Sequence, residues 1–171
     1  MDPTDGVYFG QKVKPGVTSS GDNMSGAGSG DDEKLFCNLA EVPAEVTTLA
    51  FCVNIYSNGA TFADVQNAYV RLYNTKTSHE YARFTLSREA MGAKSALVFA
   101  FLVRDTKSCL KDEWSIMSVG EVCDGRTVKE IASPLWDGKW SGVAKYGVGA
   151  ANVPSSIPAP SGNDGGCCAL S

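Results

Sequence analysis

The chain has 171 residues and a mass of 18.0 kDa, which suits one domain better than two, because domains usually contain about 100–150 residues. Hydrophobic residues make up 43% and charged residues 20% of the sequence, as in globular proteins, and no apolar run approaches the roughly 20 residues of a membrane-spanning helix. The formal net charge of −4 argues against a nucleic-acid-binding protein, which normally carries a basic face.

The negative charge lies in the N-terminal segment. Residues 1–33 carry six acidic and two basic side chains, a net charge of −4, whereas residues 34–171 carry 13 of each. The negative charge is therefore a property of this segment and not of the whole chain.

The first informative segment is a glycine-rich loop over residues 22–33 with oxygen-bearing side chains at both ends. Ca²⁺ takes roughly six to eight oxygen ligands, and glycines let the backbone turn its carbonyl groups inward. The loop is not an EF-hand, because Met24 and Gly26 stand where oxygen ligands are needed and Ala27 replaces the turn glycine. Its composition leaves two alternatives open, a Ca²⁺ site and a solvated polar loop that leads into a strand at Leu35.

Five later segments have the pattern of β-strands. In the first of them, apolar residues alternate with other residues, which is the period of a half-buried strand. The fourth is almost continuously apolar, as a strand covered on both faces would be. The five segments are residues 49–56, residues 67–74, residues 80–86, residues 96–103 and a short run around Trp114, Ile116 and Val119. Five strands at short spacing predict an all-β fold, a β-sandwich.

Helical signals are few. Residues 61–64 have the form of a capped first turn, and Asp124 is placed to cap a short helix that runs to Ile131. We therefore expect one or two short accessory helices.

The composition changes after residue 133. Residues 134–171 contain four of the seven prolines and seven of the 18 glycines, which predicts a flexible tail behind a folded region of residues 1–133. The tail closes with Cys168-Ala169-Leu170-Ser171, a C-a-a-X sequence of the type that directs farnesylation in eukaryotes.

Lipidation would give the chain a membrane surface as a partner. A single lipid chain gives only marginal membrane binding, so stable anchoring would require a palmitoyl group on Cys167 beside a prenyl group on Cys168. The N-terminus lacks the pattern of a secretory signal, and we expect a cytoplasmic protein that is membrane-associated through its C-terminus.

The remaining cysteines and the arginines do not predict an enzyme. The sequence has no Gly-x-Ser-x-Gly elbow, no phosphate-binding loop and no zinc-type CxxC spacing. Its one histidine, His79, lies in a turn-like segment. Three strand arginines offer an anion or nucleotide pocket as an alternative, although strand arginines more often face solvent or pair with carboxylates; these are Arg71, Arg83 and Arg104.

Four blocks in a fixed order carry a family resemblance from about residue 7 to about residue 132. The blocks are Asp22-Asn23-x-Ser25-Gly26-x-Gly28-x-Gly30-Asp31-Asp32-Glu33, residues 62–71, residues 80–86, and residues 96–99 followed by Trp114-x-x-x-x-Val119-Gly120. Their order resembles that of the TerD family of tellurite-resistance and stress proteins. The resemblance implies a small β-sandwich that binds Ca²⁺ through the acidic loop, and some relatives are described as cyclic-AMP-binding.

Carried over position by position, the resemblance gives five candidate Ca²⁺ ligands and no catalytic residue. The candidate ligands are Asp22, Asn23, Asp31, Asp32 and Glu33. Family members usually have acidic residues at the positions of Ala27 and Ser29. Because the number of charged ligands tunes Ca²⁺ affinity, we expect a weak site with a dissociation constant on the order of 10⁻⁴ M or weaker.

The family pattern also begins with strands and a second acidic motif that this chain lacks, so the resemblance implies a domain that is incomplete at its N-terminus. Missing strands predict an unpaired sheet edge, which invites a partner strand.

Three functional hypotheses follow. The first is a non-enzymatic Ca²⁺-binding module with a stress-response or signalling role, tethered to a membrane. The second is a degenerate protein-interaction domain that works without metal, and the third is a receptor for a small ligand such as cyclic AMP. The sequence does not specify the protein partner.

Overall fold

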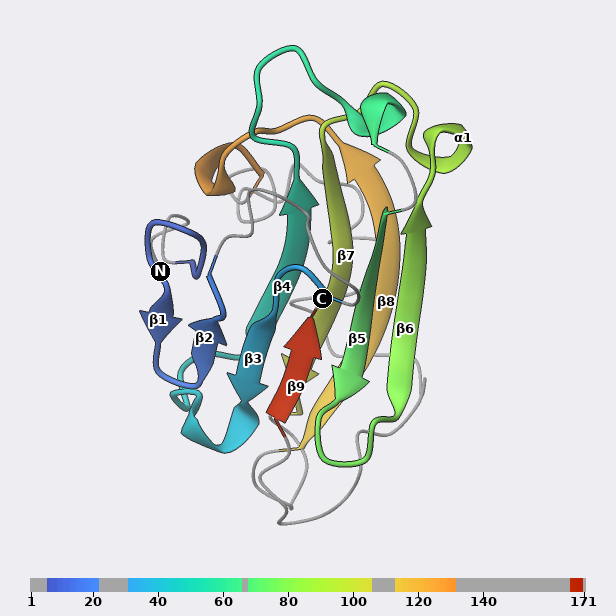
Figure 1. The fold of residues 1–171 in the computed structure, drawn as a ribbon. Helices are drawn as coiled ribbons and strands as arrows, with labels where there is room; N and C mark the ends of the chain where they lie inside the picture. Colours follow the sequence, from blue (N-terminus) through green and yellow to red (C-terminus); the bar gives the residue numbers. More distant parts are fainter. Residues whose placement is uncertain (1–5, 22–30, 66–67, 106–112, 132–166, 171) are drawn as a thin grey trace.

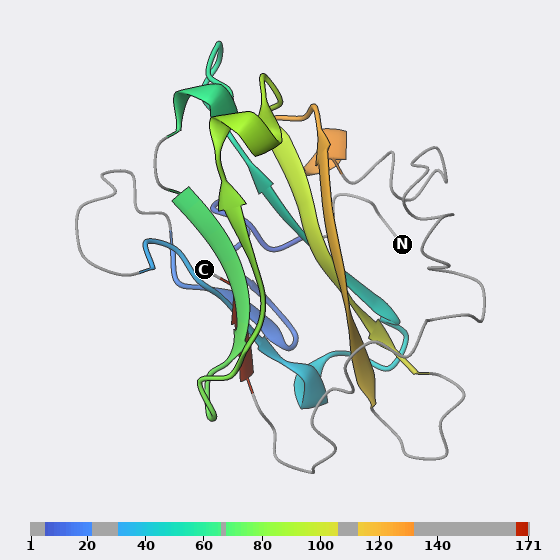
Figure 2. The ribbon, with the colours of Figure 1, turned by 90° about the vertical axis from the view of Figure 1, so that its right-hand side faces the viewer.

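The computed structural model describes residues 6–21, 31–65, 68–105, 113–131 and 167–170 of the chain. Within these ranges the strands form two antiparallel sheets, which pack face to face in two layers (Figure 1, Figure 2). The all-β fold expected from the sequence is confirmed.

The larger sheet has the strand order β1-β2-β3-β9-β5-β6, and the smaller sheet has the order β4-β7-β8. The strands of the larger sheet are β1 (Val13–Lys14), β2 (Val17–Ser19), β3 (Leu35–Asn38), β9 (Cys167–Leu170), β5 (Ala68–Asn74) and β6 (Glu80–Leu86). Those of the smaller sheet are β4 (Thr48–Asn54), β7 (Ala96–Arg104) and β8 (Trp114–Cys123). The predicted strands correspond to β4–β8, although β8 continues beyond the run that the sequence indicated.

Short helical segments connect the strands at the ends of the sandwich. They are η1 (Leu39–Glu41), η2 (Phe62–Asp64) and α1 (Arg88–Met91). A further helical turn over residues 128–131 follows β8, where the sequence predicted a short helix capped by Asp124 and running to Ile131. The predicted cap of η2 is present, because Thr61 Oγ1 accepts a hydrogen bond from the N–H of Ala63 at 3.2 Å and Asp64 accepts one from the N–H of Thr61 at 2.9 Å. Among the described residues, no helix is both long enough and apolar enough to cross a membrane.

Strand β7 forms the centre of the core and is buried on both faces, as its apolar run predicted. One face packs into the space between the sheets, where Phe99 and Leu102 are at most 1% exposed. The other face packs with β8 and the residue 128–131 turn, through Val98, Phe101 and Ile131. Because both faces are covered, alternation with polar residues is not required.

Arg104 at the end of β7 has a structural role instead of lining a pocket. It is 9% exposed and donates hydrogen bonds to the backbone carbonyls of Val42 at 2.8 Å, Pro43 at 3.1 Å and Val46 at 3.1 Å. Its guanidinium also lies 4.5 Å from the centroid of the Trp114 ring. Arg104 therefore ties the segment before β4 to the end of β7, with its charge satisfied by carbonyl dipoles.

The C-terminal region differs from the flexible tail that the sequence predicted for residues 134–171. Residues 167–170 form β9, which lies inside the larger sheet between β3 and β5. Residues 134–166 of the predicted tail lie outside the described residues. A strand of four residues is too short to show a hydrophobic period, and the hydrogen bonds that fix it come from two neighbours distant in sequence.

Gly120 is required by the packing of the two sheets. Its φ is +68°, and a Cβ at this position would overlap the ring of Phe84, which packs edge to face on Phe99 with centroids 5.3 Å apart. We expect Gly120→Ala to lower the free energy of unfolding by about 3 kcal/mol, because overpacking adds to backbone strain.

Gly59→Ala is the matched control. Gly59 has a similar φ of +80°, but no heavy atom lies within 4 Å of its added Cβ, so only the strain of about 1 kcal/mol applies. Urea unfolding followed by tryptophan fluorescence measures both variants. Equal losses of stability would contradict the packing role of Gly120.

Candidate functional site

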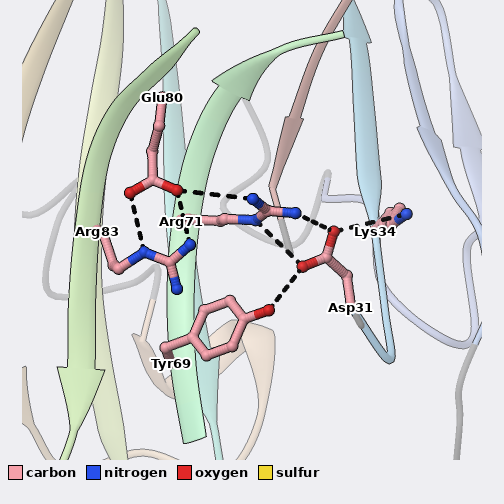
Figure 3. Close-up of polar contacts among 6 residues, drawn as sticks. All are labelled: Asp31, Lys34, Tyr69, Arg71, Glu80 and Arg83. Atoms are coloured by element: carbon pink, nitrogen blue, oxygen red, sulfur yellow. Dashed lines mark hydrogen bonds and ion pairs between the residues drawn. The ribbon is translucent and has the colours of Figure 1, made fainter. Parts of the chain in front are cut away.

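The C-terminal end of the acidic loop is fixed to the larger sheet through the carboxylate of Asp31, which is 3% exposed. Arg71 donates from Nε to Oδ1 at 3.1 Å and from Nη2 to Oδ2 at 2.6 Å, and the Tyr69 hydroxyl donates to Oδ1 at 3.0 Å (Figure 3). Lys34 Nζ lies 3.5 Å from Oδ2. We call this arrangement the Asp31 clamp; its residues are Asp31, Lys34, Tyr69 and Arg71. A bidentate arginine–carboxylate pair is one of the stronger polar contacts in proteins.

The strand alternation and the register explain why these side chains meet. On β5, Val70 and Leu72 face the core and are buried, so Tyr69 and Arg71 lie on the opposite face. Strands β3 and β5 are both antiparallel to β9, and Leu35 and Leu72 both pair with Leu170. The residues that precede β3 therefore lie alongside the first half of β5.

A second carboxylate extends the clamp across β6. Glu80 accepts hydrogen bonds from Arg83 Nε at 2.8 Å and Nη2 at 2.7 Å, and its Oε2 lies 3.6 Å from Nη1 of Arg71 (Figure 3). The Arg83 guanidinium lies 4.3 Å from the centroid of the Tyr69 ring, and that of Arg71 lies 4.6 Å from the centroid of the Tyr73 ring. The two sequence-predicted candidates for an anion pocket, Arg71 and Arg83, are thus paired with carboxylates.

These pairs keep the groups charged. The hydrogen bond from Arg83 lowers the pKa of Glu80, and the hydrogen bond to Asp31 raises the pKa of Arg71. The Glu80–Arg83 pair lies at the surface, with the two side chains 34% and 41% exposed, so solvent screens it and its contribution to stability is small. In the Asp31–Arg71 pair the two side chains are 3% and 28% exposed, so solvent screens this pair less.

The five predicted Ca²⁺ ligands have different positions. Asp22 and Asn23 lie outside the described residues, whereas Asp32 and Glu33 come directly after Asp31 in the sequence and are exposed. The oxygens of Asp31 already accept hydrogen bonds from Tyr69 and Arg71, and its role as a Ca²⁺ ligand stays a prediction, as it does for the other four residues. Within the described part of the chain, no three Asp, Glu, His or Cys side chains are grouped so that they could hold a metal ion.

Three of the cysteines pack against the core: Cys37 is buried, and Cys52 and Cys123 are partly buried. Cys37 is fully buried, and burial, with a smaller effect of Cys123, raises the pKa of Cys52 to about 12. Such a thiol stays protonated at neutral pH and is a poor nucleophile. The predicted lipidation sites, Cys167 and Cys168, are the first two residues of β9. Their lipidation stays a prediction.

Comparisons of the sequence with known proteins identify one family model and several relatives. Residues 1–134 match the family model described as the TerD domain. The chain is 37% identical over 119 residues to the tellurium resistance protein TerZ of Serratia marcescens, which covers 70% of this chain and 57% of that protein. It is 33% identical over 128 residues to general stress protein 16U of Bacillus subtilis, which covers 72% of this chain and 63% of that protein. The chain therefore spans somewhat more than half the length of these relatives.

The energetic weight of the Asp31 clamp is measured by a double-mutant cycle with Asp31→Asn and Arg71→Met. Met keeps the aliphatic contacts of arginine while removing the charge. Because Arg71→Met leaves the Asp31 carboxylate, which is 3% exposed, without its bidentate partner, we expect a coupling energy of about 2 kcal/mol in urea unfolding.

The control cycle uses Glu80→Gln and Arg83→Met on the same sheet face. This pair is exposed, and its coupling should fall within the error of the measurement. A coupling energy for Asp31 and Arg71 no larger than that of the control pair would contradict the clamp.

Proposed function

Since the chain belongs to the TerD family, we propose that it acts in a stress response as a non-enzymatic binding module whose acidic loop takes up Ca²⁺ weakly. Relatives named as tellurium resistance and stress proteins support the stress-response role. The Ca²⁺ site and the absence of catalysis are our inferences for this chain.

The observation that carries the metal proposal is the Asp31 clamp. It holds one end of the loop against β5, while the next two carboxylates, Asp32 and Glu33, remain at the surface. A loop that is already fixed at one end loses less conformational entropy when it closes on an ion. Asp31 is then a positioning residue, and the ligands come from the rest of the predicted set.

In this proposal Asp32 and Glu33 provide carboxylate oxygens from one end of the loop, and Asp22 and Asn23 provide oxygens from the other. Bound Ca²⁺ would supply positive charge that offsets the repulsion among neighbouring carboxylates. With Asp31 held by Arg71, and with Ala27 and Ser29 in the loop, few charged ligands remain. This supports a dissociation constant on the order of 10⁻⁴ M or weaker.

The surroundings of His79 and Cys52, two residue types that often act in catalysis, support a non-enzymatic role. His79 is exposed after the β5–β6 turn, and its ring packs against Tyr81 with centroids 5.1 Å apart. The pKa of about 12 keeps the Cys52 thiol protonated. Neither group has the environment of an activated base or nucleophile.

A second candidate function is a metal-free interaction domain. It is favoured by the same clamp, because Arg71 and Lys34 already balance the charge of Asp31 without an ion. The two candidates differ in their response to Ca²⁺.

Thermal unfolding in about 5 mM CaCl₂, in EGTA and in MgCl₂ distinguishes them. A ligand at about 50 times its dissociation constant stabilises the native state by about 2 kcal/mol, so we expect Ca²⁺ to raise the melting temperature by several degrees and Mg²⁺ to raise it less. The combined variant Asp32→Asn and Glu33→Gln should lose this rise. Glu45→Gln, which removes an exposed carboxylate outside the loop, should retain it.

A melting temperature unchanged by Ca²⁺ in the wild-type chain would contradict the metal proposal and favour the interaction domain. Calorimetric titration giving micromolar Ca²⁺ binding would contradict the weak affinity. A rise with cyclic AMP would instead support the small-ligand hypothesis.

A further inference from the structure

Strand β9 is the last described strand in sequence, yet it lies in the middle of the larger sheet (Figure 1). Residues 132–166 lie between it and the preceding described residue, Ile131. It pairs with β3 over four positions and with β5 over three. Because β3 and β5 are both antiparallel to β9, they are parallel to each other, and β9 separates them.

Strands β3 and β5, which we call the two walls beside β9, each pair with a further strand. Strand β3 pairs on its far side with β2 over three positions, and β5 pairs on its far side with β6 over six positions. Removal of β9 would leave both walls in place, each with a row of backbone N–H and C=O groups facing the gap. Such a gap is suited to an extended peptide, which binds through main-chain hydrogen bonds on both sides.

The register defines which side chains the gap accepts. Position 168 lies opposite Cys37 and Asn74, and position 170 lies opposite Leu72. Those three wall residues are 0–5% exposed. Directly opposite residues in antiparallel pairs share one face of the sheet, so positions 168 and 170 belong to the face that packs on the smaller sheet. An occupant therefore needs small or apolar residues at two alternate positions, and charge there would be buried.

The Asp31 clamp closes one end of the gap. Leu35 and Leu72 both pair with Leu170. Arg71, which immediately precedes Leu72 in β5, binds Asp31, which lies shortly before the first residue of β3 (Figure 3). The clamp thus joins the two walls beyond the end of β9. It holds their separation independently of the strand between them.

We propose that the gap between β3 and β5 is a binding site for an extended partner peptide with uncharged residues at two alternate positions, and that residues 167–170 are the chain's own displaceable occupant. The occupant is short, with four positions against one wall and three against the other, whereas β4 and β7 pair over seven. Short pairings open at low free-energy cost. Residues 167–170 are covalently part of the same chain, which raises their effective concentration at the gap, so the chain's own strand competes with any partner.

Full-length Ala169→Pro tests this proposal. Position 169 pairs with Phe36 and Tyr73, and proline there removes an N–H and disfavours the strand. The probe is a fluorescein-labelled synthetic peptide with the sequence of residues 163–170, kept reduced. We expect Ala169→Pro to bind it at least ten times more tightly than the wild-type chain, because the competing strand is withdrawn. Ala150→Pro, the same substitution outside β9, should behave like the wild type.

A peptide with aspartate at the positions of residues 168 and 170 is the matched negative probe and should not bind. Equal affinity of the folded Ala169→Pro variant and the wild type for the unmodified peptide would overturn the proposal. So would a wild-type dimer, seen by light scattering, that Ala169→Pro converts to a monomer, since a second copy would then be the occupant.

Amide hydrogen exchange on the wild-type chain tests the same site if Ala169→Pro does not fold. Excess peptide should accelerate exchange at residues 167–170 while residues 35–38 and 72–74 stay protected. Unchanged protection of residues 167–170 at saturating peptide would overturn the proposal.

Discussion

The bidentate hydrogen bonds between Arg71 and the buried carboxylate of Asp31 connect the parts of this molecule that bear on its function. They join the acidic loop to the larger sheet and lie beside strand β9. A carboxylate that is 3% exposed loses most of its hydration, and only a partner of opposite charge with matching geometry makes that position favourable. The Tyr69 hydroxyl donates a further hydrogen bond to the same carboxylate.

This interaction gives Asp31 a different role from its neighbours in the sequence. Three consecutive acidic residues suggest three equivalent ligands, yet the first is directed to an arginine and the next two are at the surface. The C-terminal end of the loop, at Asp31, is thereby held on the outer face of β5. The proposed Ca²⁺ site and the proposed strand-binding gap are therefore adjacent features that share the same anchor.

Much of the fold was predictable because its longer strands are encoded locally. Strand β6 has the predicted bounds, and the unbroken apolar run of β7 predicted burial on both faces. Strands β1 and β2 were missed because two or three residues show no periodicity. Strand β9 was assigned to a flexible tail because its hydrogen bonds come from β3 and β5, which lie far away in the sequence.

The sequence allows the residue types of the candidate site to be predicted, but not which side chains contact one another. Alternation along β5 is enough to place Arg71 on the face opposite the buried Val70 and Leu72, but nothing local indicates that its partner is Asp31, 40 residues earlier. Arg104 is also a strand arginine, at the end of β7, and instead binds backbone carbonyls. The choice among solvent, carboxylate and carbonyl partners is set by tertiary packing, which a single sequence does not display.

The most direct test of the clamp is the NMR signal of the Arg71 side chain. If the bidentate pair forms, the Arg71 Nε–H should exchange slowly with water at neutral pH and should become fast in Asp31→Asn, while the Arg83 Nε–H is unaffected. An Arg71 Nε–H that exchanges as fast as that of a free arginine, with no response to Asp31→Asn, would contradict the account.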